Sequence, residues 1–142
     1  MQPRTMRAEA RDGESFCIVM TCSDGDEASQ VAEQLSQVNK GVLITYRRCA
    51  DVLTNSPRGR VALIVLASME TPAELGRALN WMRNRWPNCP ITVVGDTGGG
   101  NVEVAARQGG ACFLARPVTR DQWQAIVSHT LEVPQRVPIT DR

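Results

Sequence analysis

The sequence has a single histidine, His129, and lacks the side-chain combinations on which several enzyme classes depend. No cysteine or acidic residue stands at metal-ligand spacing from His129. A His-based hydrolase or a Cys-His nucleophile would have only this one base to draw on. We therefore expect no catalytic residue, no metal site and no cofactor, and an enzyme is the least favoured interpretation.

Net charge of either sign is also nearly absent, because 16 Lys and Arg balance 15 Asp and Glu to give +1. This balance provides no basic field that would attract nucleic acid or an anionic membrane, so neither is an expected partner. No apolar stretch approaches the roughly 20 residues that cross a bilayer. The polar segment Met1–Glu14 lacks the apolar core of a signal peptide, so the expected location is the cytoplasm.

The five cysteines show no paired short spacing of the kind found in metal knuckles and disulfide frameworks. They are expected to be cytosolic thiols. Cys17, Cys49 and Cys112 lie in or beside apolar runs, which predicts that they are buried as small hydrophobic side chains. Cys22 and Cys89 are expected to be more exposed.

The composition, 42% hydrophobic in 142 residues, suffices for one core, and the single domain is expected over residues 15–132. Residues 1–14 and 133–142 are polar and aperiodic, which predicts a flexible tail and a tail or linker stub. Five short apolar runs, mostly β-branched or aliphatic, predict strands. They are Phe16–Met20, Val42–Tyr46, Val61–Leu66, Ile91–Val94 and Ala111–Leu114.

Hydrophobicity in these runs is continuous rather than alternating, which is typical of parallel strands covered by helices on both faces. Helices are predicted in the four intervening segments and after the last run. Two of these helices begin with capping boxes, Thr71 with Glu74 and Thr119 with Gln122. The pattern predicts a doubly wound α/β sandwich with right-handed crossovers, which binds ligands at the carboxyl ends of its strands.

A resemblance to a known family comes from Gly109-Gly110-Ala111-Cys112-Phe113-Leu114-Ala115-Arg116-Pro117. This segment is similar to the pattern G-A-x-x-(F/Y)-(L/I)-x-K-P around the fifth strand of response-regulator receiver (CheY-like) domains. The resemblance implies a flavodoxin-like three-layer sandwich of five parallel strands, in the order 2-1-3-4-5, with five helices. It also implies that the first and last helices share one face, and that the peptide before Pro117 is cis.

Receivers use an acidic pair after the first strand to hold magnesium, and an aspartate after the third to accept a phosphoryl group. A Thr or Ser ends the fourth strand and a lysine follows the fifth. In this sequence Ala67 falls at the aspartate position, Gly95 at the hydroxyl position and Arg116 at the lysine position. The resemblance therefore implies a degenerate phosphorylation pocket. Its expected residues are Cys22, Asp24, Asp26, Ala67, Gly95 and Arg116.

Three acids, Asp24, Asp26 and Glu27, come a few residues later than the family's magnesium pair. They could gather a cation weakly, or they could be the N-terminal acids that a helix dipole favours, with Ser23 or Asp24 as N-cap. We expect Arg116 to reach Asp24 or Asp26 and to fill the space of the phosphoryl group. As an exposed pair, this contact would contribute about 0–1 kcal/mol.

Two further features have both a ligand-binding and a structural interpretation. The loop Asp96-Thr97-Gly98-Gly99-Gly100 could cradle an anion with its backbone N–H groups, or could be a flexible connection. Arginines at 47–48, 58–60 and 83–85 could contact phosphates, or could be solvated helix ends and loops.

The favoured function is a pseudo-receiver, a signalling domain that is not phosphorylated and acts within a bacterial two-component-type or transcription-regulatory system. From the resemblance, it would bind a protein partner, or itself as a homodimer, through helix 101–108, strand Ala111–Leu114 and the helix after Thr119. A sensor of nucleotides or anions is the alternative, and a phosphorylatable response regulator is a further one. An enzyme would require Cys22 to be an activated thiol, which its pKa would decide.

Overall fold

The computed structural model describes residues 4–6, 16–36, 42–67, 71–96, 98 and 100–128, and strands alternate with helices along them. His129 and residues 133–142 lie outside the described residues. The strands are β1 (Arg4–Met6), β2 (Cys17–Thr21), β3 (Val42–Tyr46), β4 (Val61–Leu66), β5 (Ile91–Gly95) and β6 (Cys112–Ala115). The helices are α1 (Gly25–Ser36), α2 (Cys49–Thr54), α3 (Pro72–Arg85) and α4 (Gly100–Gln108), and residues 120–128 form a further helix.

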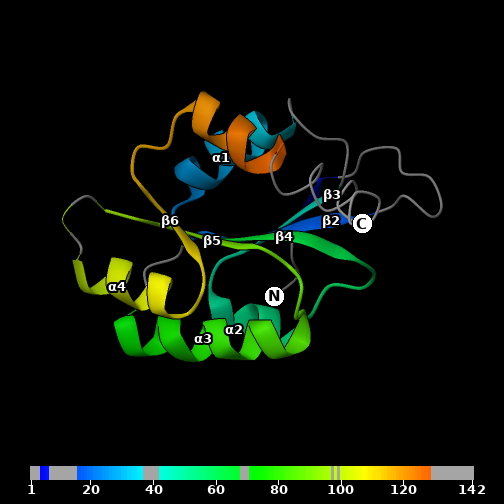
Figure 1. The fold of residues 1–142 in the computed structure, drawn as a ribbon. Helices are drawn as coiled ribbons and strands as arrows, with labels where there is room; N and C mark the ends of the chain where they lie inside the picture. Colours follow the sequence, from blue (N-terminus) through cyan, green and yellow to red (C-terminus); the bar gives the residue numbers. More distant parts are fainter. Residues whose placement is uncertain are drawn as a thin grey trace, which may run out of the picture.

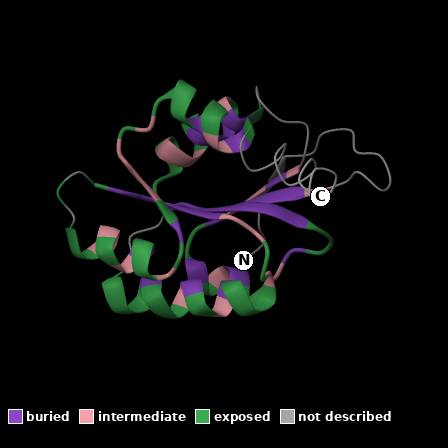
Figure 2. Ribbon diagram, viewed as in Figure 1, coloured by how far each residue is buried: buried purple, intermediate pink, exposed green. Residues whose placement is uncertain are grey.

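Each of the five predicted strands is present, with ends that differ by no more than one residue from the apolar runs. They pair in parallel in the order β3-β2-β4-β5-β6, which is the predicted order 2-1-3-4-5. Every residue of β2, β4 and β5 is buried, as Figure 2 shows. Burial on both faces explains why these runs do not alternate with polar residues.

One strand was not expected, because residues 4–6 belong to the segment predicted to be a flexible tail. Arg4–Met6 pairs antiparallel with β3 and forms the outer edge of a six-stranded sheet. An edge strand offers unpaired backbone N–H and C=O groups, so a partner strand can add there without apolar side chains. The pairing therefore left no trace in the hydrophobic pattern, and the five central strands remain parallel.

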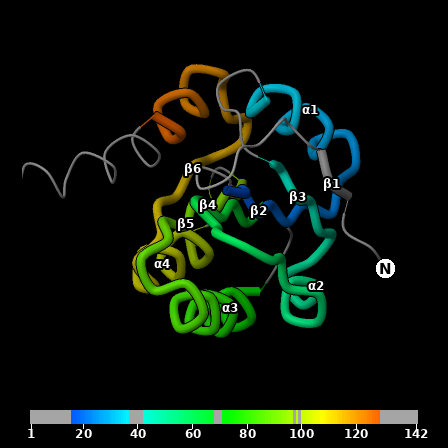
Figure 3. The backbone as a smooth tube through the Cα atoms, turned by 90° about the vertical axis from the view of Figure 1, so that its right-hand side faces the viewer, coloured from blue at the N-terminus to red at the C-terminus, as the bar shows by residue number. Residues whose placement is uncertain are grey.

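The helices cover the two faces of the sheet as predicted (Figures 1 and 3). On one face, α1 and helix 120–128 pack Leu35 and Trp123 against Ile18 and Met20 of β2. On the other face, α2, α3 and α4 pack against the alternate strand residues. The apolar helix residues of this second cluster are Cys49, Val52, Leu75, Leu79, Met82 and Ala106.

Both predicted capping boxes form and set the starts of their helices. Thr71 Oγ1 accepts from Glu74 N (3.1 Å), while Thr71 N donates to the Glu74 carboxylate (3.1 Å). Thr119 and Gln122 exchange the same two bonds, at 3.2 and 2.9 Å, at the start of helix 120–128. Among the described residues, no helix combines the length and apolar character needed to cross a bilayer.

Two of the cysteine predictions are wrong. Cys17 and Cys49 are buried as expected, whereas Cys112 is exposed and Cys22 is buried. Cys112 begins β6, the strand at the open edge of the sheet, so its neighbourhood is less covered than its apolar run suggested. Cys22 directly follows the central strand β2 and packs in the cluster beneath α1. Cys89 is half-buried, and so is more exposed than Cys17 and Cys49.

Candidate functional site

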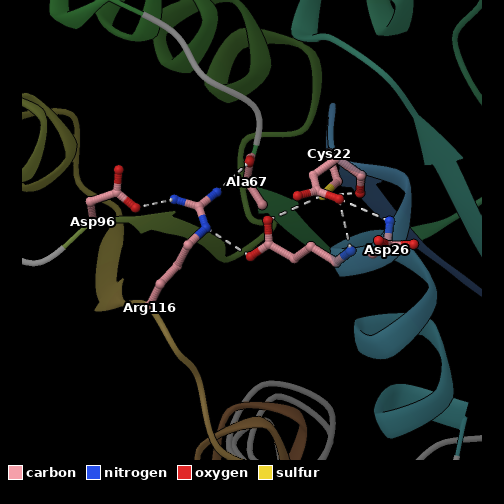
Figure 4. Close-up of polar contacts among 7 residues, drawn as sticks. Cys22, Asp26, Ala67, Asp96 and Arg116 are labelled. Carbon is pink, nitrogen blue, oxygen red and sulfur yellow. Dashed lines mark hydrogen bonds and ion pairs between the residues drawn. The ribbon is translucent and has the colours of Figure 1, made fainter.

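The candidate site lies where four parallel strands end at one edge of the sheet (Figure 4). Cys22, Ala67, Asp96 and Arg116 each directly follow a strand: β2, β4, β5 and β6 in turn. Backbone bonds continue the sheet past the strand ends, from Ala67 N to Thr21 O (2.7 Å) and from Arg116 N to Gly95 O (2.8 Å). The parallel register therefore brings residues far apart in sequence to one place.

The Arg116 side chain occupies the centre of this site. Its Nε donates to Glu27 Oε2 at 2.8 Å, and its Nη1 donates to Asp96 Oδ1 at 3.2 Å. Its Nη2 donates to the carbonyl oxygen of Ala67 at 2.7 Å. One guanidinium thus links the start of α1 to the ends of β4 and β5, as Figure 4 shows.

The pair with Glu27 is half-buried, with side-chain exposed fractions of 25% for Arg116 and 22% for Glu27. Asp96 is more exposed, at 71%. Burial by itself would lower the pKa of the Arg116 guanidinium. The hydrogen bond and charge of Glu27, and then those of Asp96, outweigh burial and raise this pKa above its ordinary value.

The prediction that Arg116 pairs with Asp24 or Asp26 is wrong, because these two residues serve the start of α1. Asp24 Oδ1 accepts the backbone N–H groups of Asp26 (2.9 Å) and Glu27 (3.2 Å), so Asp24 is the N-cap rather than Ser23. Its carboxylate is thereby held at the helix end. Glu27, in the first turn of α1, takes the predicted place of these two aspartates.

The cap that Asp24 forms at the start of α1 also bears on whether Asp24, Asp26 and Glu27 bind a cation. The part of the chain that the structure describes contains no group of three or more His, Cys, Asp or Glu side chains arranged to hold a metal ion. The described contacts of Asp24 and Asp26 therefore favour the helix-terminal interpretation of these acids over the cation-binding one.

Ala67 and Gly95 offer neither a carboxylate nor a hydroxyl to the site. Ala67 is buried and contributes only its carbonyl oxygen, which binds Arg116. A Cβ added to Gly95 would lie 2.9 Å from Phe113 Cε1 and 3.1 Å from Cζ. The Phe113 ring of β6 therefore fills the space that a Thr or Ser side chain would enter at this position.

The Cys22 thiol contacts Asp24 O at 3.4 Å and Glu27 Oε1 at 3.5 Å. Burial raises the pKa of this thiol to about 11, and the charge of Arg116 lowers it too little to offset that effect. The thiol is therefore protonated at neutral pH, which does not fit the activated nucleophile that an enzyme would need.

The glycine-rich loop is described in part. Gly98 adopts the left-handed φ of 88°, and Gly100 is the first residue of α4. Thr97 and Gly99 lie outside the described residues. Within the described part, Asp96 turns its carboxylate to Arg116, so the start of this loop is tied to the site.

A hollow of about 300 Å³ adjoins Arg116 between α1 and the start of helix 120–128, and Gln30, Gln34 and Trp123 help to line it. Trp123 is buried, and its Nε1–H has no hydrogen-bond acceptor among the described residues. A buried donor without an acceptor costs about 1–3 kcal/mol, so an acceptor that reached it would be favourable.

No protein-family model matches the sequence, and no curated protein sequence matches it. Solved structures do match the fold. A two-component response regulator from Clostridium difficile is 16% identical over 85% of this chain and 98% of that chain, with a TM-score of 0.71. The receiver domain of NtrX from Brucella abortus is 20% identical over 82% and 98% of the two chains, with a TM-score of 0.63. The chain has the fold of a response-regulator receiver.

The receiver fold also occurs in proteins with other names. A putative pilus assembly protein (cpaE) from Burkholderia thailandensis is 12% identical over 82% of this chain and 97% of that chain, with a TM-score of 0.66. The cis peptide that the resemblance implied is present between Arg116 and Pro117. Sequence reasoning did not assign Glu27 or Phe113 to the receiver-fold site, although the N-cap signal at Asp24 could have pointed to Glu27.

Proposed function

We propose that this chain is a pseudo-receiver, a receiver-fold domain that signals by protein contact without being phosphorylated. The position of the Arg116 guanidinium carries the proposal. It binds Glu27, Asp96 and the Ala67 carbonyl together, at the strand ends where the receivers that it resembles hold a phosphoryl group. The contacts that a receiver would form on phosphorylation are replaced here by contacts that need no phosphoryl group.

The chemistry of the site supports the same proposal. Phosphoryl transfer needs a nucleophile and cationic groups that stabilise the developing negative charge. Ala67 supplies a methyl group, and the Cys22 thiol is protonated at neutral pH. Among the described residues at the strand ends, the cation is Arg116, and it already faces two carboxylates, which leaves little positive charge for an incoming phosphate.

Labelling with acetyl phosphate and Mg²⁺ tests the proposal directly. We expect the intact mass of the full chain to stay unchanged, because Ala67 stands at the position of the phosphorylated aspartate, and the nearby carboxylates of Glu27 and Asp96 are paired with Arg116. A stable gain of one phosphate that hydroxylamine removes would contradict the proposal. A phosphorylatable receiver treated alongside controls for the activity of the reagent.

For the partner surface we propose the face of α4, β6 and helix 120–128, which would bind a protein partner or a second copy. Val104 on α4 supports this choice, because it is an exposed large hydrophobic residue at 51%. Phe113 of β6 packs on Gly95, so the arrangement of the site is linked to this face. The domain would act in the cytoplasm, in a two-component-type or transcription-regulatory system.

Replacing Val104 by Asp tests the surface, with Leu53→Asp as the matched control. Leu53 is 46% exposed but lies on α2, outside the proposed face. We expect Val104→Asp to weaken dimerisation in light scattering, or capture of the native partner, about tenfold, because a carboxylate would be desolvated in the interface. Equal effects of the two substitutions would contradict the surface.

A small-ligand sensor is the second candidate, and the hollow beside Arg116 supports it. Its lining includes the side chain of Arg116 and the buried Trp123 indole, whose N–H has no acceptor among the described residues. Thermal denaturation in the presence of nucleotides and small anions tests this candidate. A rise in melting temperature that Trp123→Phe abolishes would support it, whereas no rise with any compound would contradict it.

A further inference from the structure

A second hollow, of about 450 Å³, lies at the opposite edge of the sheet from Arg116. It is formed where β4 and β5 begin and where α3 ends, and Arg60, Arg85, Trp86, Cys89 and Pro90 contribute to its lining. The fold thus brings together one arginine from the 58–60 cluster and one from the 83–85 cluster. They are far apart in sequence, and none of the functions above uses them.

The walls of this hollow are held by backbone hydrogen bonds. Cys17 N donates to Arg60 O at 2.9 Å, and Ile64 N donates to Pro90 O at 3.1 Å, so both walls extend the sheet. Trp86 ends α3 through a bond from its N to Met82 O at 2.7 Å. A ligand would therefore meet walls that are already ordered, which lowers the entropic cost of binding.

The charge in this hollow is positive and unbalanced. No acidic residue is among those that line it, and within the described chain neither Arg60 nor Arg85 forms an ion pair. Arg85 lies in the last turn of α3, where the helix dipole stabilises a cation. Arg60 precedes a strand, so no helix dipole accounts for its charge. Arg60 is therefore a stronger indication of an anionic ligand than Arg85 is.

An aromatic platform stands beside these cations. The Arg85 guanidinium lies 5.1 Å from the centroid of the half-buried Trp86 ring. Trp86 in turn meets Trp81 edge to face, with centroids 5.7 Å apart at 83°. Guanidinium groups pair with phosphate oxygens, and an indole can contact a planar ring.

We propose that this hollow binds a small anion that carries a planar ring, which is the chemistry of a nucleoside monophosphate. Arg60 and Arg85 bind the phosphate, and Trp86 contacts the ring. The volume falls within the roughly 300–1,000 Å³ of small-molecule sites. The site is separate from the partner surface of α4 and β6, so it adds a ligand input to the proposed signalling function.

Calorimetric titration of the full chain with adenosine monophosphate tests this proposal. We expect saturable binding that weakens with added salt, and binding of adenosine or inorganic phosphate at least about tenfold weaker. Arg60→Ala should weaken binding about tenfold or more, the effect of losing one charged hydrogen bond. Arg60→Lys should lose less, because it keeps the charge.

Arg58→Ala is the matched control, because Arg58 is an exposed arginine in the same loop that does not line the hollow. It should leave binding within about twofold, because an exposed charge that does not line the hollow makes no direct hydrogen bond to the ligand. Absence of binding at millimolar nucleotide, equal losses in the Arg58 and Arg60 variants, or phosphate binding as tight as the nucleotide would each overturn the proposal. Binding of polyglutamate without nucleotide binding would also overturn it, in favour of an acidic protein partner.

Discussion

Replacing Arg116 by alanine removes a side chain that links α1 to the ends of β4 and β5 at the candidate site. The exposed fractions of the paired side chains set the size of the effect. At 25% and 22%, the Arg116–Glu27 pair lies between exposed pairs, worth about 0–1 kcal/mol, and buried pairs, whose disruption costs about 3–5 kcal/mol. We therefore expect Arg116→Ala to lower the free energy of unfolding by about 1–3 kcal/mol.

Urea denaturation followed by circular dichroism measures this loss, with Arg107→Ala as the control. Arg107 also pairs with a glutamate, Glu103 at 2.9 Å, but the exposed fractions are 62% and 42%, so the control should cost about 0.5 kcal/mol or less. A double-mutant cycle of Arg116→Ala with Glu27→Gln isolates the pair itself. Its coupling energy should be about 1 kcal/mol.

The refuting result is a loss from Arg116→Ala that does not exceed the loss from Arg107→Ala, together with a coupling energy of zero. The contacts of the Arg116 guanidinium would then contribute no more to the free energy of unfolding than the water contacts that replace them. This prediction departs from the exposed pair expected from the sequence, because the true partner is Glu27, which is half-buried.

The other predictions concern packing and the buried thiol. Gly95→Ala should lower the free energy of unfolding, measured by thermal denaturation, by about 1–3 kcal/mol, because the added Cβ would clash with the Phe113 ring. An unchanged free energy of unfolding would contradict this packing. Gly76→Ala, in open space on α3, should instead raise stability by up to about 1 kcal/mol. Because the folded pKa of Cys22 is raised from 9.0 to about 11, its contribution to stability is complete below pH 9 and lost as pH rises through 11. Cys22→Ala should flatten the fall in urea stability over that range, and DTNB should label the exposed Cys112 of the native chain long before Cys22.

Much of the fold could be predicted because its signals are local. The five parallel strands are buried on both faces, so each appears as a short continuous apolar run. The capping boxes at Thr71 and Thr119 lie within four residues of sequence and form as predicted. The edge strand Arg4–Met6 could not be predicted in this way, because it pairs through its backbone and its three residues of sequence form no continuous apolar run.

By itself, the sequence determined which chemical groups the site lacks, since Ala67 and Gly95 have no carboxylate or hydroxyl in any conformation. Tertiary structure decided which groups meet there. Asp24 is held by its helix cap, so Arg116 pairs with Glu27 in the first turn of α1 and with Asp96 beyond β5. The reason is geometric: a residue type is a local property, whereas a contact depends on the strand register and helix start that place two side chains within about 3 Å of each other.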